Sequence, residues 1–447
     1  MQKRSLFSLS LLAFIIHIPL SSAADLITTY QQALQSDPSL QEALATQLAA
    51  QEILPQRRAN VLPSLVISAN TANVRNNITP ENNTAAAVFN TNTHGYTLLL
   101  SQPIFNYQSW VQLQQATQIV KQANANYQTA MQDLMLRVTK AYFNVLLAKD
   151  NLNFIKAKAQ TTQHHLEQIK ARYQVGLDTL TSLSEAQAAY DATLAQQISA
   201  DNDLVNSKEQ LQTLTGVYPQ DFAEIRQPLA LVTPLPIDVE AWVKMALTHN
   251  WQLQALSYAQ NSARDAIKII QAGNLPTLSA VGSYQNYRGT YLLNPQSNLQ
   301  TTSVGFQLSL PIYNGGLITS QTRQAHYDYQ KANSAFEIAY RNVKATTRQT
   351  FNSILAGISK LKADQQAIKS NQSALTTTQA AFNAGTRTIV DVLNIQQGLY
   401  AVQLQYAQDE YAYIIDTLTL KFLTGALCTN DLIQINTWLQ TVKIDNG

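Results

Sequence analysis

The feature that most constrains this chain is a long stretch without helix breakers. From residue 106 to residue 175 there is no glycine or proline, and alanine, glutamine, leucine and lysine, which favour helices, are frequent. One continuous helix over this stretch is roughly 100 Å long. Its apolar residues recur at alternating intervals of four and three, with one extra interval of four between Leu134 and Val138. Such an insertion locally relaxes a left-handed supercoil, so that the packed helices run nearly straight. Because no globular core covers such a rod, we expect other rods to pack against it.

Partner helices of similar character follow in the sequence. The long ones are predicted over residues 177–215, 317–384 and 386–424. Gly176 and Gly385 then lie at equivalent hairpin tips, because glycine lets the backbone enter the left-handed conformation that ends a helix. Shorter helices are predicted over residues 24–58, with a break near Pro38, and over residues 239–271.

An internal duplication organises the chain. Short motifs of the first half return in the same order in the second: LPSL (62–65) as LPTL (275–278), SQPIFN (101–106) as SLPIYN (309–314), FNVLLA (143–148) as FNSILA (351–356), and LTG (214–216) as LTG (423–425). The sequence therefore predicts two structurally equivalent repeats, residues 25–218 and 237–447. A proline-rich linker over residues 219–236 connects them.

The N-terminus has the pattern of a cleaved secretory signal peptide, residues 1–24. Lys3 and Arg4 precede an apolar run over residues 6–18, and small residues precede Asp25. The apolar run is shorter than the roughly 20 residues that a spanning helix needs. We therefore expect an exported chain without a transmembrane helix.

Charge and cysteine content exclude several functional classes. The chain has 30 Lys and Arg against 28 Asp and Glu, a net charge of +2, which lacks the basic excess of a nucleic-acid-binding protein. The single cysteine, Cys428, excludes an internal disulfide and is expected to be buried as a small apolar residue. No Gly-x-Ser-x-Gly or His-Glu-x-x-His motif occurs. We therefore predict no enzyme activity, no catalytic residue, no metal site and no cofactor.

Four segments alternate with the period of a strand. They are residues 65–70, 96–101, 278–283 and 304–310, in which apolar residues face one side and small or polar residues the other. We expect strands of about ten residues, which is the length that crosses a bilayer when tilted. The polar stretches 76–92 and 289–300 are expected to be exposed loops.

Four strands cannot close a barrel, and an open edge in lipid leaves backbone groups without hydrogen-bond partners. One alternative is a soluble sheet covered by helices, but the predicted helices are too long to fold back over so small a sheet. Closed single-chain barrels begin at eight strands, so two or three copies must combine theirs. Three copies give twelve strands and a lumen wide enough for a pore.

Several motifs together carry a family resemblance. They are the strand-to-helix corners at 101–105 and 309–313, the tip sequence Val175-Gly176-Leu177, and GTRTIVDVL at 385–393. In these the chain resembles the TolC family of trimeric outer-membrane ducts. The resemblance implies a mixed α/β homotrimer in the outer membrane of a Gram-negative cell. A twelve-stranded transmembrane barrel, four strands per chain, continues into the periplasm as a long α-helical barrel.

The resemblance also implies partners. In the family the periplasmic tip is closed until a periplasmic adaptor protein and an inner-membrane pump or ABC transporter recruit the duct. The adaptor contacts carried over to this chain are Val175, Gly176, Leu177, Ala384, Gly385 and Thr386. Multidrug efflux and type I protein secretion share such an exit, so the sequence leaves the cargo open. The alternative is a secreted trimeric helical stalk or adhesin without a lumen, which has no use for lipid-facing strands.

The entrance of the duct is assigned to the second tip. Asp391 matches the family's first entrance aspartate and forms a ring of three carboxylates in a trimer. Like charges this close raise the apparent pKa and attract cations. Asn394 occupies the second aspartate position, so the second charged ring is missing. Capture of cations is therefore expected to be weaker than in a relative with two rings.

The residues that hold the family's tip closed are only partly present. Arg387 matches the arginine of this latch and Thr181 its threonine. However, Phe382 stands in place of a tyrosine and Ser182 in place of an aspartate, and these two cannot donate a hydrogen bond or carry a charge, respectively. A hydrogen bond to a charged group contributes roughly 1.5–3 kcal/mol. We therefore predict a less firmly latched entrance.

Overall fold

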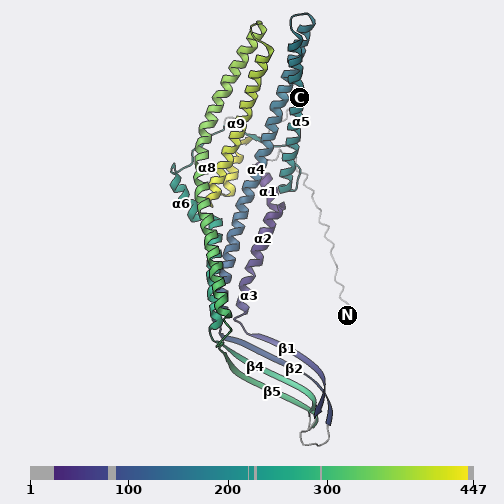
Figure 1. Ribbon diagram of the computed structural model, residues 1–447, viewed down its shortest axis with the longest axis vertical. Helices are drawn as coiled ribbons and strands as arrows, with labels where there is room; N and C mark the ends of the chain where they lie inside the picture. The colour runs from purple at the N-terminus through teal and green to yellow at the C-terminus, as the bar shows by residue number, and fades with distance from the viewer. Residues whose placement is uncertain (1–24, 79–86, 220, 226–228, 292–293, 441–447) are drawn as a thin grey trace, which may run out of the picture.

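The computed structural model describes residues 25–78, 87–219, 221–225, 229–291 and 294–440. The predicted signal peptide, residues 1–24, lies outside the described residues. The molecule is an elongated bundle of helices with a sheet at one end, bent away from the bundle (Figure 1). The helices are α1 (Leu26–Ser36), α2 (Pro38–Gln51), α3 (Ile53–Ala59), α4 (Tyr107–Gln174), α5 (Leu180–Thr215), α6 (Val239–His249), α7 (Trp251–Gln271), the short 3-10 helix η1 (Ala272–Asn274), α8 (Leu317–Asn383), α9 (Ile389–Leu423) and α10 (Thr429–Asn436).

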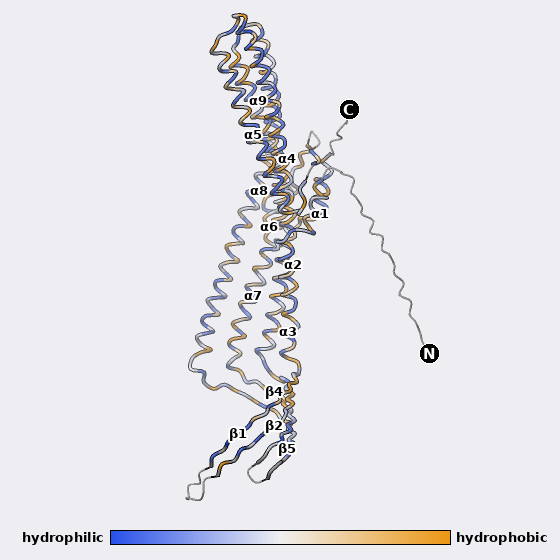
Figure 2. The backbone as a smooth tube through the Cα atoms, turned by 90° about the vertical axis from the view of Figure 1, so that its right-hand side faces the viewer, coloured by the Kyte–Doolittle hydropathy of each residue, from blue (hydrophilic) through white to orange (hydrophobic). Residues whose placement is uncertain are grey.

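The four predicted rods are confirmed as α4, α5, α8 and α9. The helices α4 and α8 have 68 and 67 residues and run the length of the bundle. The helices α5 and α9 accompany their half remote from the sheet, whereas α2, α3 and α7 accompany the half beside it (Figures 1 and 2). The predicted break at Pro38 is also confirmed, because Pro38 begins α2 and the Asp37 carboxylate accepts a hydrogen bond from the Leu40 amide at 3.0 Å.

Both hairpin tips close in the same way, as the repeated glycines predict. Gly176 and Gly385 have φ values of 75° and 77°, in the left-handed region. The amide of Leu177 donates to the Arg172 carbonyl at 2.9 Å, and that of Thr386 donates to the Ala381 carbonyl at 2.9 Å. An equivalent backbone hydrogen bond thus ends α4 and α8, and the chain turns into α5 and α9.

The strands form one antiparallel sheet in the order β1-β2-β4-β5. They are β1 (Ser64–Ile78), β2 (Ala87–Phe105), β4 (Thr277–Tyr291) and β5 (Asn294–Ser309). A short two-stranded sheet pairs β3 (Glu224–Ile225) with β6 (Leu439–Gln440). The strand positions are confirmed, but the expected length of about ten residues is wrong, since the four strands have 15 to 19 residues.

The longer strands also correct the expected loops. Much of 76–92 and 289–300 is strand, because backbone pairing continues past the apolar residues, to Ile78 opposite Ala87 in one hairpin and Tyr291 opposite Asn294 in the other. The ladder of N–H and C=O groups needs no apolar side chains, so polar Asn- and Thr-rich segments extend it. Hydrophobic alternation therefore marked only part of each strand.

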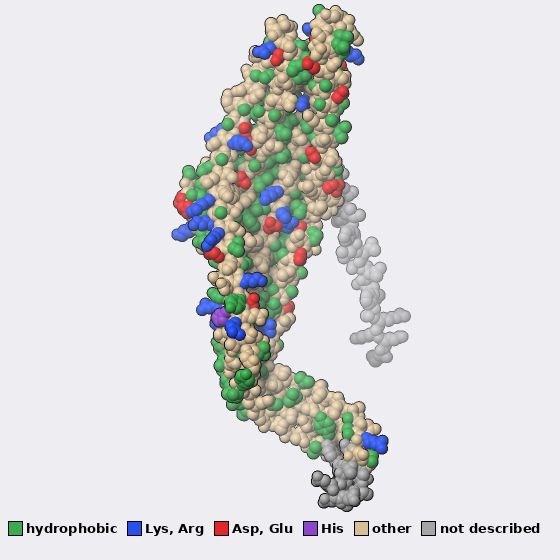
Figure 3. Space-filling model, viewed as in Figure 1, with side chains coloured by type: hydrophobic (Ala, Val, Ile, Leu, Met, Phe, Trp, Pro, Cys, Tyr) green, Lys and Arg blue, Asp and Glu red, His purple; other side chains and the backbone are tan. Residues whose placement is uncertain are grey.

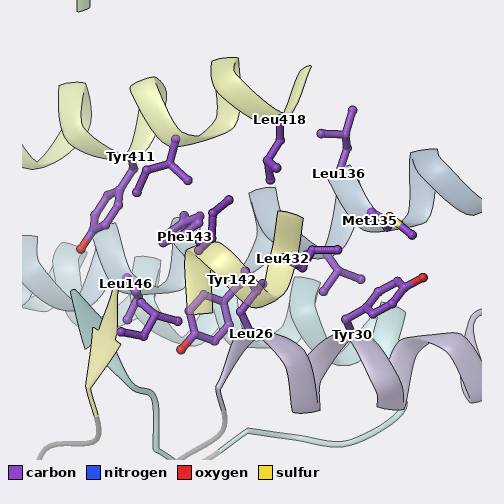
Figure 4. Packing of buried hydrophobic residues seen from close by; sticks show 14 of the residues in the cluster. Leu26, Tyr30, Met135, Leu136, Tyr142, Phe143, Leu146, Tyr411, Leu418 and Leu432 are labelled. Carbon is purple, nitrogen blue, oxygen red and sulfur yellow. The ribbon is translucent and has the colours of Figure 1, made fainter. Parts of the chain in front are cut away.

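The largest core lies at mid-length of the bundle, where α1, α10 and the β3–β6 pair pack against α4 and α9. Tyr142 and Phe143 are fully buried there, and the Phe143 ring stacks on Tyr411 with centroids 5.3 Å apart (Figure 4). The Tyr142 hydroxyl donates to the Ala223 carbonyl at 2.9 Å. Cys428, expected to be buried, is instead exposed, because it is the cap residue that begins α10.

Candidate functional site

The two tips of the bundle are joined by a small apolar core of their own. Its buried members come from all four long helices: Ile169 of α4, Ala186 of α5, Phe382 of α8, and Ile389 and Val392 of α9. This core is separate from the mid-length core. The two hairpins of one protomer are therefore in direct contact near the tips.

Asp391, the predicted entrance carboxylate, lies in the first turn of α9. Its Oδ2 accepts hydrogen bonds from the Thr388 amide and the Thr388 hydroxyl, both at 2.9 Å, and the Asp391 amide donates back to that hydroxyl at 3.3 Å. This reciprocal arrangement is a capping box, which the sequence Thr-x-x-Asp encodes. Asp391 therefore has a local structural role in addition to any role at an entrance.

The same contacts also affect the pKa of the Asp391 carboxyl group within one protomer. The hydrogen bonds from the backbone and the side chain of Thr388 lower the pKa of Asp391 below its usual value, and the nearby Arg387 guanidinium acts in the same direction. The raised pKa that we expect from a ring concerns carboxylates of neighbouring copies, so it stays a prediction. Asn394 is exposed about one turn further along α9.

The predicted latch residues do not meet within the described protomer. The Arg387 guanidinium, just before α9, lies 3.8 Å from the Asp391 carboxylate in the first turn of that helix, and the described residues include no hydrogen bond from Arg387 to Thr181 or Ser182. Thr181 is exposed, and the Ser182 hydroxyl lies 3.0 Å from that of Thr179. Phe382 is only 4% exposed and belongs to the tip core. Its ring therefore packs between the hairpins.

Sequence reasoning missed two residues near the first tip, Arg172 and Asp178. Arg172, near the end of α4, has its guanidinium carbon 5.8 Å from the centroid of the Phe382 ring, and its Nε donates to the Asp178 carboxylate at 3.2 Å. Partial burial acts to raise the pKa of Asp178, but hydrogen bonds from Ser182, the Thr179 amide and Arg172 together lower it. Residues 172 and 382 are distant in the chain, so no local pattern links them. The phenylalanine at position 382 was the only sequence signal for this contact.

The predicted adaptor contacts lie at the two tips and differ in character. Val175 and Leu177 of the first tip are 70% and 67% exposed. Ala384, Gly385 and Thr386 of the second tip are exposed but small or polar. The first tip thus presents an apolar surface and the second does not.

The sheet at the other end has two unpaired outer strands, β1 and β5, among the strands that the structure describes. Along β5 the large apolar residues Val304, Phe306 and Leu308 are 86%, 78% and 69% exposed. Charged side chains are scattered over the helical body but are few on the visible face of the sheet (Figure 3). Among the described helices, none contains a stretch sufficiently long and apolar to cross a bilayer.

Comparison with known proteins assigns the family. The family model described as "Outer membrane efflux protein" matches residues 29–217 and 242–426. The chain belongs to the outer membrane efflux protein family. Among its members, the "Outer membrane protein TolC" of Vibrio cholerae is 35% identical over 430 residues, which is 94% of this chain and 95% of that protein. The "Proteases secretion protein PrtF" of Dickeya chrysanthemi is 28% identical and covers 95% of this chain and 93% of its own length.

Solved structures agree on the fold of the outer membrane efflux proteins. The CmeC outer membrane channel of Campylobacter jejuni superposes with a TM-score of 0.80 at 17% identity, over 94% of this chain and 92% of that one. The family resemblance read from the motifs is thereby confirmed. This protein is an export channel of the outer membrane with a periplasmic helical tunnel, which favours the duct over a stalk or adhesin.

Proposed function

We propose that three copies of this chain form one duct, in which the outer strands β1 and β5 of neighbouring copies pair to close a twelve-stranded barrel. The observation that carries this proposal is the four-stranded sheet with two open edges and exposed Val304, Phe306 and Leu308 on one side. An edge strand left open in lipid costs several kcal/mol per backbone group. Pairing between copies removes both edges.

The helices support the same assembly. On α5, Leu194, Ile198 and Val205 are 37%, 72% and 48% exposed, although they are aliphatic, and on α8 Tyr327 and Ile338 are 70% and 61% exposed. Neighbouring copies would cover such residues in a closed helical tunnel. Each protomer contributes two repeats, residues 25–218 and 237–447, joined by the linker 219–236.

The tips form the periplasmic entrance in this proposal. Three Asp391 carboxylates surround the narrow end and favour cations, while Asn394 adds no charge. A periplasmic adaptor binds the tips at Val175, Gly176, Leu177, Ala384, Gly385 and Thr386, and an inner-membrane pump or ABC transporter supplies the energy. The chain itself carries no catalysis. Relatives named for the secretion of proteases and the export of pyoverdine make both proteins and small molecules candidate cargo.

Ion selectivity tests the entrance. Purified protein in planar bilayers should lose cation preference in Asp391→Asn, by about fivefold in the permeability ratio, because the amide keeps the shape of the side chain and removes its negative charge. The matched gain-of-charge variant Asn394→Asp should raise the preference by adding a second ring. Conductance and selectivity that are insensitive to Asp391→Ala and to Arg387→Ser would show that the entrance is assigned to the wrong residues.

Crosslinking tests the adaptor surface and identifies the cargo class. A photoreactive residue at Val175 or Leu177 should trap a periplasmic protein in the native cell, because these side chains are exposed and apolar. The same residue at exposed Ile433, in the mid-length part of the bundle, is the control. Equal crosslinking from both positions would contradict docking at the tips.

A further inference from the structure

Arg172 and Phe382 connect the two hairpins of one protomer at the tip. Arg172 belongs to the α4–α5 hairpin and Phe382 to the α8–α9 hairpin, and 5.8 Å separate the guanidinium carbon from the ring centroid. This distance lies within the range in which a cation is attracted by an aromatic ring. The contact is thus a charge-assisted link across the interface between the hairpins.

Asp178 holds the guanidinium in this position. Its carboxylate accepts from Arg172 Nε at 3.2 Å and from the Thr179 amide at 3.1 Å. The Asp178 side chain is only 14% exposed, and that of Arg172 is 35% exposed. Arg172 is therefore anchored within its own hairpin while it covers a residue of the other.

We propose that Arg172 and Phe382 form a clasp that keeps the two hairpins of each protomer together at the entrance, with Asp178 as the residue that positions Arg172. The inference deepens the proposed function, because it rests on the tips being the entrance. It differs from the latch expected from the family resemblance, whose hydrogen bonds come from the second hairpin. Here the cation comes from the first hairpin and closes over an apolar core.

Burial of Phe382 explains why the clasp opposes opening. The ring is 4% exposed and packs with Ile169, Ile389 and Val392, so separating the hairpins exposes it to water. The exposed Arg387 guanidinium, meanwhile, lies 3.8 Å from the Asp391 carboxylate of its own hairpin. Phe382 is therefore held between the hairpins by packing and by the Arg172 contact, without a hydrogen-bond donor at position 382.

Hydrogen–deuterium exchange of the full-length, detergent-solubilised protein tests the clasp. We expect amides of residues 375–395 to exchange about three- to tenfold faster in Arg172→Gln and in Phe382→Leu, in line with the strength of a partly exposed cation–aromatic contact. Arg172→Lys, which keeps the charge, should restore part of the protection. Lys170→Gln removes an exposed positive charge from the same helix and should leave exchange unchanged.

A double variant separates the clasp from general damage to the tip. If the guanidinium acts on the ring, Arg172→Gln adds little to the exchange rate in the Phe382→Leu background, since coupled residues are not additive. The proposal of a clasp is wrong if the increases in exchange rate of the two single variants add in the double variant, or if Lys170→Gln increases exchange as much as Arg172→Gln. The conductance of the same variants in planar bilayers tests separately whether the tips form the entrance. Fast exchange without higher conductance leaves the clasp standing and shows that the tip is not the entrance.

Discussion

Gly425→Ala is expected to destabilise the protein by about 2–5 kcal/mol. Alanine is strained in the left-handed backbone conformation, and its added methyl group overpacks the site. Gly425 has a φ of 67°, and an added Cβ would lie 2.3 Å from the His249 carbonyl oxygen. The opposing backbone has little freedom to retreat, because the Asn250 side chain donates to the Leu423 carbonyl at 2.9 Å. The midpoint of thermal unfolding, followed by the helical circular dichroism signal, measures the loss.

The repeated sequence Leu-Thr-Gly, at 214–216 and 423–425, supplies the matched control. Gly216 ends α5 in the equivalent motif and has nearly the same φ, 71°, but an added Cβ there meets only the Ser36 side chain at 3.4 Å. Gly216→Ala should therefore cost only the backbone term of about 1–2 kcal/mol. Equal losses for the two variants would show that the crowding by His249 relaxes without cost, and the larger figure for Gly425 would then be wrong.

The helical part of this fold was predictable because its determinants are local. Absence of glycine and proline from residues 106–175 defined α4 to within a residue at each end, and Gly176 and Gly385 placed both tips. Helix propensity and C-terminal capping depend only on residues that are close together in the chain, so they can be read from a single sequence. The assignment of function came from the family motifs, since Gly385-Thr386-Arg387 has no chemistry that names a duct.

The features that sequence reasoning missed depend on what lies opposite in space. The ends of the strands are set by pairing such as Ile78 with Ala87, to which the side-chain pattern is indifferent. Phe382 was judged by the hydrogen bond that it cannot donate, whereas its burial depends on Ile169 and Ile389 of other helices. Arg172 likewise gains its role from a ring on the other hairpin. Tertiary contacts between distant residues leave no local pattern.

Phe306→Lys is expected to prevent most of the protein from assembling in the outer membrane. Phe306 lies on β5 and is 78% exposed in the single protomer, between similarly exposed Val304 and Leu308. If this face meets lipid in the proposed barrel, a lysine on it costs up to about 2–4 kcal/mol in each copy, and less the nearer it lies to the membrane surface. Three copies carry the charge, so the cost to the trimer is about three times larger. Trimer yield after chemical crosslinking of outer-membrane fractions measures the effect.

Gln307→Lys is the matched control, because adjacent residues of a strand point to opposite faces of the sheet. The same charge one residue along β5 would then face the lumen, where water solvates it, and the trimer yield should stay near that of the unaltered protein. A loss confined to Gln307→Lys would invert the assignment of the two faces. Equal tolerance of both variants would remove the lipid contact altogether, and with it the reason for three copies to combine their strands. The comparison therefore bears on assembly and on membrane insertion at once, since in this geometry neither occurs without the other.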